Sequence, residues 1–156
     1  MADAGPAFRE PSPLARVFNR AFGLLVGLGV APRGYYLLQV KGRKSGRVYS
    51  MPVSLVSLHG VRFLVAPRGR TQWVRNAEAS NEVVLKRGAS RLRCRLRALS
   101  DADKPPVLLA YLERYRSVVQ RYFPVPAGSP ARAFAEIAPR YPVFELLPTG
   151  DVAADP

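Results

Sequence analysis

The sequence predicts a mainly β fold with helices (α+β), in which a small antiparallel barrel has helices at its ends. Three observations predict this fold. The middle of the chain alternates apolar and polar residues in short stretches that glycine and proline turns separate. Apolar residues at helical spacing precede and follow this region. The chain has 156 residues, of which 48% are hydrophobic, which is typical of one domain that folds around its own core.

We expect a single domain with loose tails at residues 1–12 and 148–156. Residues 13–30 predict an amphipathic helix, because apolar residues recur at helical spacing and Pro13 suits a first turn. This helix packs on the core or contacts a membrane surface through residues 14–28, and both readings stay open. The chain shows no secretory signal at its start, so we expect a cytoplasmic protein.

Five predicted strands form the first part of the barrel. They cover residues 35–41, 48–58, 61–66, 83–86 and 91–99. The pair His59-Gly60 predicts a hairpin turn, and residues 71–80 predict a short helix with Thr71 as its N-cap. In the fifth strand Arg91, Arg93, Arg95 and Arg97 alternate with Leu92, Cys94 and Leu96, which predicts one charged and one apolar face.

A helix and a last strand are predicted after the barrel strands. Asp101 and Asp103 complement the dipole at the start of a helix, and Pro105 and Pro106 are tolerated in its first turn. Its apolar stripe comprises Leu108, Tyr111, Leu112, Tyr115, Val118, Val119 and Tyr122. Residues 131–138 predict a short helix. Residues 141–147 predict the last strand, and Pro142 suggests that this strand lies at an edge.

Residues 33–97 carry the excess positive charge of the chain. The formal net charge is +13, and this stretch holds fifteen basic residues against two acidic ones, Glu78 and Glu82. Such a field raises the local concentration of polyanions. It therefore favours a phosphorylated cofactor, a nucleic acid or an anionic membrane surface as partner.

The single histidine and the single cysteine limit the chemistry that the protein can perform unaided. One cysteine forms neither an internal disulfide nor a Cys-based zinc cage, and one histidine builds no His-rich site, so we expect no metal. His59 falls in the predicted hairpin turn and Cys94 on the apolar face of a strand, so neither is placed to act as base or nucleophile. An enzyme with this inventory takes its reactivity from a cofactor.

The basic turn at residues 42–47 is the best candidate for a cofactor site. Its two glycines allow the backbone to approach an anion closely. Its three cations and one hydroxyl supply charged and neutral hydrogen-bond donors.

Four segments in a fixed order resemble the deazaflavin-dependent nitroreductase family, over residues from about 37 to 147. They are GRKSG at 42–46, MPV at 51–53, FLVA at 63–66 and QWVRN at 72–76. Members of this family are split β-barrels that bind coenzyme F420, a deazaflavin with a phosphate and polyglutamate tail. The resemblance implies hydride transfer from reduced F420 to a small organic acceptor such as a quinone, nitroaromatic or enone. It implies no catalytic residue of the protein's own.

The resemblance also implies where the cofactor and substrate lie. The phosphate end of the cofactor would be held by Arg43, Lys44, Ser45 and Gly46, with Arg47 nearby. The ring would lie along Met51 and Pro52, with Ala66, Pro67 and Arg68 on its other side. The pocket would be closed by Gln72, Trp73 and Asn76. The substrate would be walled by Tyr111, Tyr115 and Tyr122, unless these pack as ordinary helix residues.

The sequence departs from the family's pattern in two places. Tyr49 and Ser50 stand where a basic residue often precedes the strand proline, and Arg47 is close enough to compensate. Ala77 and Glu78 stand where an aliphatic and then a basic residue commonly follow the helix asparagine.

Three other readings remain open. The same kind of barrel binds FMN instead of F420. A nucleic-acid-binding barrel would use the arginines of residues 91–97 together with Tyr35, Tyr36 and Trp73. A membrane-surface protein would use residues 14–28. The sequence alone leaves the hydride acceptor and the oligomeric state open.

Overall fold

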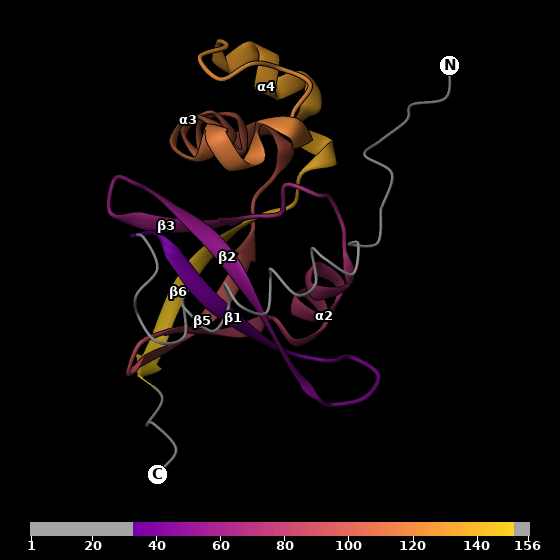
Figure 1. Ribbon diagram of the computed structural model, residues 1–156. Coiled ribbons are helices and arrows are strands. Elements are labelled where there is room, and N and C mark those ends of the chain that lie inside the picture. Colours follow the sequence, from indigo (N-terminus) through magenta and orange to yellow (C-terminus); the bar gives the residue numbers. More distant parts are fainter. Residues whose placement is uncertain (1–32, 152–156) are drawn as a thin grey trace.

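The computed structural model describes residues 33–151, and Figure 1 shows their arrangement. Six antiparallel strands close into a barrel in the order β1-β2-β3-β6-β5-β4. The strands are β1 (Tyr35–Lys41), β2 (Val48–Leu58), β3 (Val61–Val65), β4 (Glu82–Arg87), β5 (Ser90–Ala98) and β6 (Val143–Asp151). The helices of this part of the chain are α2 (Gln72–Ser80), α3 (Pro105–Val119) and α4 (Ala131–Ile137). The helix predicted for residues 13–30 lies outside the described residues, as does its proposed membrane contact.

The barrel interior is filled by the apolar side chains that alternate along each strand. Leu38, Leu64 and Leu85 are almost completely buried there, and Cys94 is fully buried among them. The predicted two faces of the fifth strand are confirmed, because Cys94 and Leu96 point inward while Arg93, Arg95 and Arg97 are exposed. The cysteine is therefore part of the core.

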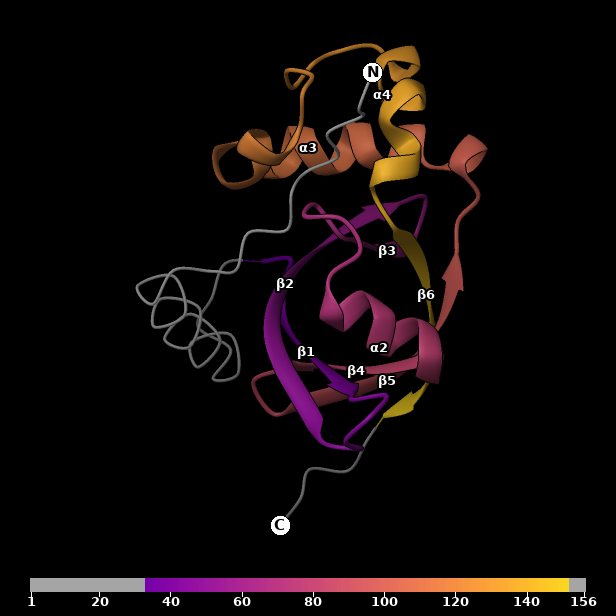
Figure 2. The same cartoon turned by 90° about the vertical axis from the view of Figure 1, so that its right-hand side faces the viewer.

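Helix α2 closes one end of the barrel. Figure 2 shows it across the opening of the ring that the strands form, and Figure 1 shows it to one side of the strands. Val74 and Ala77 are fully buried in the barrel cluster, and Trp73 packs against it with its ring centroid 6.5 Å from that of Phe144. Small side chains at 74 and 77 let the helix approach the strands closely.

Helices α3 and α4 form a separate layer at the top of the molecule in Figure 1, packed on the outer face of β2 and β3. Their core is a second cluster rich in aromatic residues, in which Tyr111, Phe134 and Tyr141 are almost completely buried. The rings of Phe123 and Tyr141 are stacked with centroids 4.5 Å apart. Three 3-10 helices flank α3 and α4 within residues 33–151, at Asp101–Asp103, Gln120–Tyr122 and Ala138–Arg140.

The predicted edge position of the last strand is wrong. β6 pairs with β3 on one side and with β5 on the other, so the barrel is closed there. Pro142 precedes the first residue of β6, and its carbonyl accepts a hydrogen bond of 3.0 Å from the Ala66 N–H. Its missing N–H therefore removes no hydrogen bond from the ladder. β6 also continues through residues 148–151, which the sequence predicted as part of a loose tail.

Two details of the α3 region also differ from prediction. Asp101 and Asp103 lie in a separate 3-10 helix, because Lys104 turns inward between them and α3 to bind Asp101 and the Ala138 carbonyl. Val118, predicted in the apolar stripe, is 49% exposed. The backbone at Tyr115 leaves helical geometry (φ −112°, ψ 20°), and after it Val119 stays buried while Val118 faces solvent. None of the helices within residues 33–151 has the length and apolarity needed to cross a membrane.

Candidate functional site

The basic turn between β1 and β2 is a compact, internally bonded loop. The Gly42 N–H donates to the Arg47 carbonyl at 2.7 Å, and the Gly46 N–H donates to the Gly42 carbonyl at 3.0 Å. Gly46 has a φ of +71°, which favours glycine. A Cβ at Gly42 would stand 2.7 Å from the ring of Tyr49. Both glycines are therefore required by the turn itself.

Arg43 attaches this turn to helix α2. Its Nη1 donates to Asn76 Oδ1 at 2.7 Å and to Gln72 Oε1 at 3.0 Å, and its backbone N–H donates to Asn76 Oδ1 at 3.2 Å. Asn76 is buried at this contact. The acceptors are neutral amide oxygens, so they orient the guanidinium without neutralising its charge. The structure thus brings together three residues that the sequence predicted for the cofactor site.

Of the other polar side chains of the turn, one stabilises its shape and two face solvent. Ser45 Oγ accepts the Arg47 N–H at 3.2 Å and lies 3.4 Å from the Tyr49 hydroxyl, so Ser45 helps to shape the turn. Lys44 and Arg47 are exposed. Among residues 33–151, no ion pair neutralises the side chains of Arg43, Lys44 or Arg47. Their positive charge is available to a ligand.

A shallow, open depression of about 510 Å³ lies beside Arg43 on the outer face of α2. It is lined by Arg43, Arg70, Arg75, Glu78 and Ala79. Arg70 donates from Nη2 and Nε to Glu78 Oε2 at 2.6 and 3.0 Å. The sequence prediction missed Arg70 and Arg75. Helical spacing could have indicated Arg75, because Arg75 lies one turn after Gln72 on the same face of α2.

Thr71 is an unusual N-cap of α2. Its backbone is extended (φ −78°, ψ −178°), as the prediction required, but its side chain makes no capping hydrogen bond. Thr71 Oγ1 is buried and has no hydrogen-bond partner in the described part of the chain. A buried hydroxyl without a partner is uncommon because its desolvation is not compensated. The start of α2, beside Gln72, therefore has a buried hydrogen-bonding group that no residue between 33 and 151 uses.

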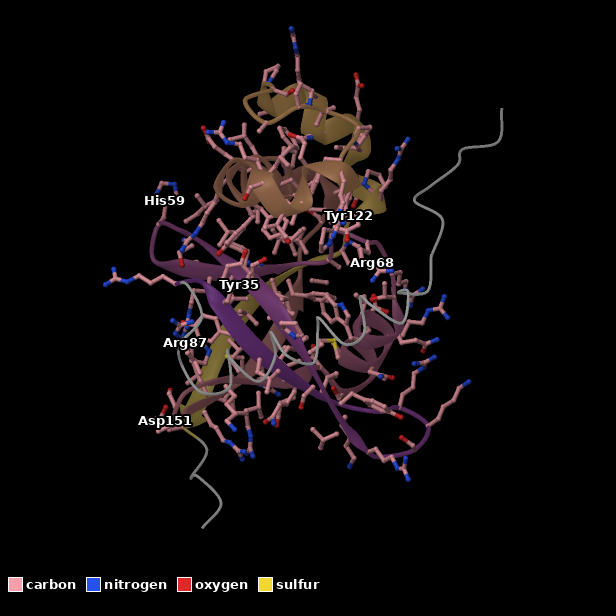
Figure 3. The ribbon with its side chains drawn as sticks, viewed as in Figure 1. Tyr35, His59, Arg68, Arg87, Tyr122 and Asp151 are labelled. Carbon is pink, nitrogen blue, oxygen red and sulfur yellow. The ribbon has the colours of Figure 1, made fainter. Side chains whose placement is uncertain are left out.

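The predicted ring-binding residues come from β2, from the loop after β3 and from α2, and not all of them share one face of the sheet. Met51 and Trp73 pack against the barrel cluster to which the buried Ala66 belongs. Pro52 follows Met51 on the same strand and therefore faces the opposite side of the sheet. Pro67 and Arg68 are half-buried on the loop that leads from β3 to α2, where Figure 3 labels Arg68.

The three tyrosines predicted for the substrate pocket belong to the α3 region. The Tyr115 hydroxyl donates to the Leu55 carbonyl at 2.5 Å, and the Tyr111 hydroxyl lies 3.4 Å from Ser54 Oγ. Burial raises the pKa of both phenols. Tyr122 is half-buried and its carbonyl accepts the Tyr141 hydroxyl at 2.6 Å. Tyr111 and Tyr115 are core residues, and the contact of any of the three with substrate stays a prediction.

The remaining reactive side chains lie away from this site. His59 forms the tip of the β2–β3 hairpin with a positive φ of 50°, as predicted, and Figure 3 shows it at the periphery of the molecule. No group of three or more histidine, cysteine or acidic residues able to hold a metal ion occurs within residues 33–151. Two arginines of the β5 ladder are neutralised, since Arg93 pairs with Glu82 and Arg97 with Glu145.

The donor set fits an anionic cofactor. Guanidinium groups favour phosphate and carboxylate, and three of them line one depression here. Lys44 and Arg47 extend the positive surface along the turn. The unpartnered Thr71 hydroxyl adds a neutral hydrogen-bonding group at the start of α2. The site is therefore suited to a group that combines a phosphate with further negative charges.

A six-stranded antiparallel barrel with one helix over its opening and further helices on its outer face is a split β-barrel. The model of the F420H(2)-dependent quinone reductase family matches residues 15–125 of this chain. The chain belongs to that family, whose members are oxidoreductases with coenzyme F420 as cofactor. No curated protein matches the sequence.

Solved structures support the fold. A protein of unknown function from Agrobacterium tumefaciens superposes with a TM-score of 0.56 at 17% identity, over 96% of this chain and 60% of that one. This chain thus spans 60% of the length of that protein. A heme storage protein from Vibrio cholerae gives a TM-score of 0.52 at 14% identity, over 93% and 95% of the two chains. A chain solved as a domain-swapped dimer gives 0.53 at 22% identity, over 86% and 99%.

Proposed function

We propose that this protein is an F420H2-dependent reductase that acts on a small organic acceptor of the quinone, nitroaromatic or enone type. The observation that carries the proposal is the attachment of the basic turn to α2 through Arg43, Gln72 and Asn76. This contact holds a guanidinium in place with its charge intact, next to Lys44, Arg47 and an open depression. Family membership supplies the identity of the cofactor.

The residues of the chain take distinct parts in this function. Arg43, Lys44 and Arg47 bind the anionic tail, while Ser45, Gly46 and Gly42 maintain the shape of the turn. Gln72 and Asn76 act as positioning residues, because they orient Arg43. The ring-binding set is Met51, Pro52, Ala66, Pro67, Arg68 and Trp73. When bound, reduced deazaflavin supplies the hydride, and the barrel end around Trp73 orients the reactants and excludes water.

Titration of the protein with F420, followed by cofactor fluorescence, tests the proposal. We expect saturable binding, and we expect Lys44→Ala to weaken it by roughly three- to tenfold at low salt. The loss should shrink as salt is added, because an exposed charge pair is screened. Arg132→Ala removes an equal charge from exposed α4 and serves as the matched control. A fluorescence signal that follows the added cofactor as it does in buffer without protein would end the proposal.

Melting temperatures with each ligand distinguish F420 binding from the FMN alternative. FMN in place of F420 should produce a smaller rise in melting temperature, since a ligand stabilises according to its affinity. Nucleic acid is disfavoured by the ion pairs that already neutralise Arg93 and Arg97. A gel shift at moderate salt is expected to show no stable complex.

A further inference from the structure

We propose that the depression on α2 binds carboxylates of the cofactor's polyglutamate tail, and that Glu78 sets how many of them it accepts. This inference rests on the proposed function and extends it to residues outside the predicted cofactor set. The depression adjoins the basic turn because Arg43 belongs to both. A tail anchored on the turn therefore has a second basic surface next to it.

The three guanidinium groups of the depression are in different states. Arg43 is held by neutral amide oxygens. The guanidinium of the exposed Arg75 has no hydrogen bond or ion pair with any residue between 33 and 151. Arg70 alone is occupied, by both of its hydrogen bonds to Glu78. Arg75 is therefore open to a tail carboxylate next to Arg43, which the phosphate end would occupy, and Arg70 holds a carboxylate of the chain itself.

Glu78 occupies Arg70 as a ligand carboxylate would. Nε and Nη2 of Arg70 both donate to one carboxylate oxygen, at 3.0 and 2.6 Å, so the donors that a ligand carboxylate would use are taken by Glu78. Glu78 also lies near the C-terminal end of α2, where a negative charge is unfavourable to the helix dipole. Its position therefore gives α2 no electrostatic advantage apart from the pair with Arg70.

The pair is weak enough for a ligand to replace. The Arg70 side chain is 64% exposed and that of Glu78 is 35% exposed, and exposed ion pairs contribute little to stability. An incoming carboxylate meets attraction from Arg75 and Arg43 but repulsion from Glu78. A tail with one glutamate uses the open Arg75, whereas further glutamates must compete with Glu78 for Arg70. Glu78 thus acts as a specificity-determining residue for tail length.

Dissociation constants for F420 with one and with several tail glutamates test this assignment. We expect the long tail to bind more tightly than the short tail in the native protein. Glu78→Gln should increase affinity for the long tail by about threefold and change the short tail less. Arg75→Gln should abolish the preference between tails. Glu113→Gln makes the same charge change as Glu78→Gln, and Arg132→Gln the same as Arg75→Gln, at exposed sites of α3 and α4. Both controls should leave the ratio of the two dissociation constants unchanged.

A free oligo-γ-glutamate peptide separates this inference from the proposed function. The peptide should raise the melting temperature of the native protein, and raise it more in Glu78→Gln. If F420 fails to bind while the peptide binds in this pattern, the proposed function is wrong and the depression is still a polycarboxylate site. If F420 binds but both tail lengths give one ratio in the native protein, Glu78→Gln and Arg75→Gln, the inference is overturned. Absence of binding by both probes overturns both.

Discussion

The molecule has two helical ends, one at α2 over the barrel opening and one at α3–α4 on the outer face of β2 and β3, and they make opposite kinds of contact. At the α2 end, small apolar residues enter the barrel while guanidinium and amide groups make the contacts outside it. At the α3–α4 end, the contacts are made by large buried side chains such as Tyr111, Phe134 and Tyr141. Apolar burial of this kind contributes stability in proportion to the area removed from water. The polar contacts at α2 contribute less stability and leave charged groups facing solvent.

The polar groups at the two ends differ in the same way. The buried Lys104 binds Asp101 at 2.7 Å and the Ala138 carbonyl at 3.2 Å, and the Tyr115 and Tyr141 hydroxyls each donate to a backbone carbonyl. These groups are satisfied within the chain. At the α2 end, the Thr71 hydroxyl has no partner within residues 33–151, and Arg75 has no ion pair there. One end thus satisfies its polar groups within the chain, while the other keeps polar and charged groups without a partner among residues 33–151, which supports the proposed binding role of α2.

The largest expected effect comes from Phe134→Ala at the α3–α4 end. Phe134 is fully buried, so its loss removes apolar burial and leaves a cavity. We expect the free energy of unfolding to fall by about 3–5 kcal/mol in urea titrations. The exposed Val118→Ala should change it by less than about 0.5 kcal/mol. The folded fraction of Phe134→Ala should bind F420 with native affinity, and a proportional loss of affinity would show that the two ends are not independent.

The sequence predicted the elements that depend on neighbouring residues and missed the contacts between residues far apart in the chain. The strands at residues 35–41 and 48–58 begin and end as predicted, because alternating side chains and glycine turns are local signals. The short helix α2 was also predicted locally, with Thr71 as its N-cap. The attachment of Arg43 to Asn76 joins residues 33 positions apart, and no local pattern reports such a contact. The depression was missed for this reason, since it exists only once the turn lies against α2.

The misread role of Pro142 has a related cause. Proline in a strand usually indicates an edge, because it lacks a ladder donor. Here it stands just before β6 and contributes only its carbonyl, to Ala66. Which strand lies beside that carbonyl depends on the closure of the barrel. Closure of the barrel therefore decides whether β6 is an edge strand, and the local sequence around Pro142 does not.

A smaller expected effect is the dependence of the free energy of unfolding on alkaline pH, which the buried Tyr111 contributes at the α3–α4 end. Burial raises the pKa of Tyr111, so above about pH 10 the unfolded chain loses that proton before the folded protein does. The unfolded state then binds fewer protons, and the free energy of unfolding falls with rising pH, by about 1.4 kcal/mol per pH unit for this group. Tyr111→Phe should remove this part of the slope in urea titrations between pH 9 and 11. Phe123→Leu perturbs the same cluster without a titrating group, so it should lower stability equally at all pH values. An unaltered slope in Tyr111→Phe would contradict the assignment.

The smallest expected effect is that of replacing Thr71 at the α2 end. The replacement should raise the stability of the ligand-free protein and lower its affinity for F420. The hydroxyl is buried, unpartnered and makes no capping bond, so its removal in Thr71→Val relieves a desolvation cost without breaking a hydrogen bond. We expect Thr71→Val to raise the free energy of unfolding of the ligand-free protein by up to about 1 kcal/mol. The extra stability should be accompanied by weaker binding of F420, because the hydroxyl is no longer present to bind it.

Thr71→Ser is the matched control, since it keeps the hydroxyl while it removes the methyl group. It should retain native affinity and lose a little stability through reduced packing. Melting temperatures with and without F420 for the three proteins give both quantities in one series. If Thr71→Val is destabilised by about 1 kcal/mol, the hydroxyl has a partner, such as the N-terminal amides of α2. The α2 end would then be satisfied within the chain like the α3–α4 end, and the contrast between them would rest on the arginines alone.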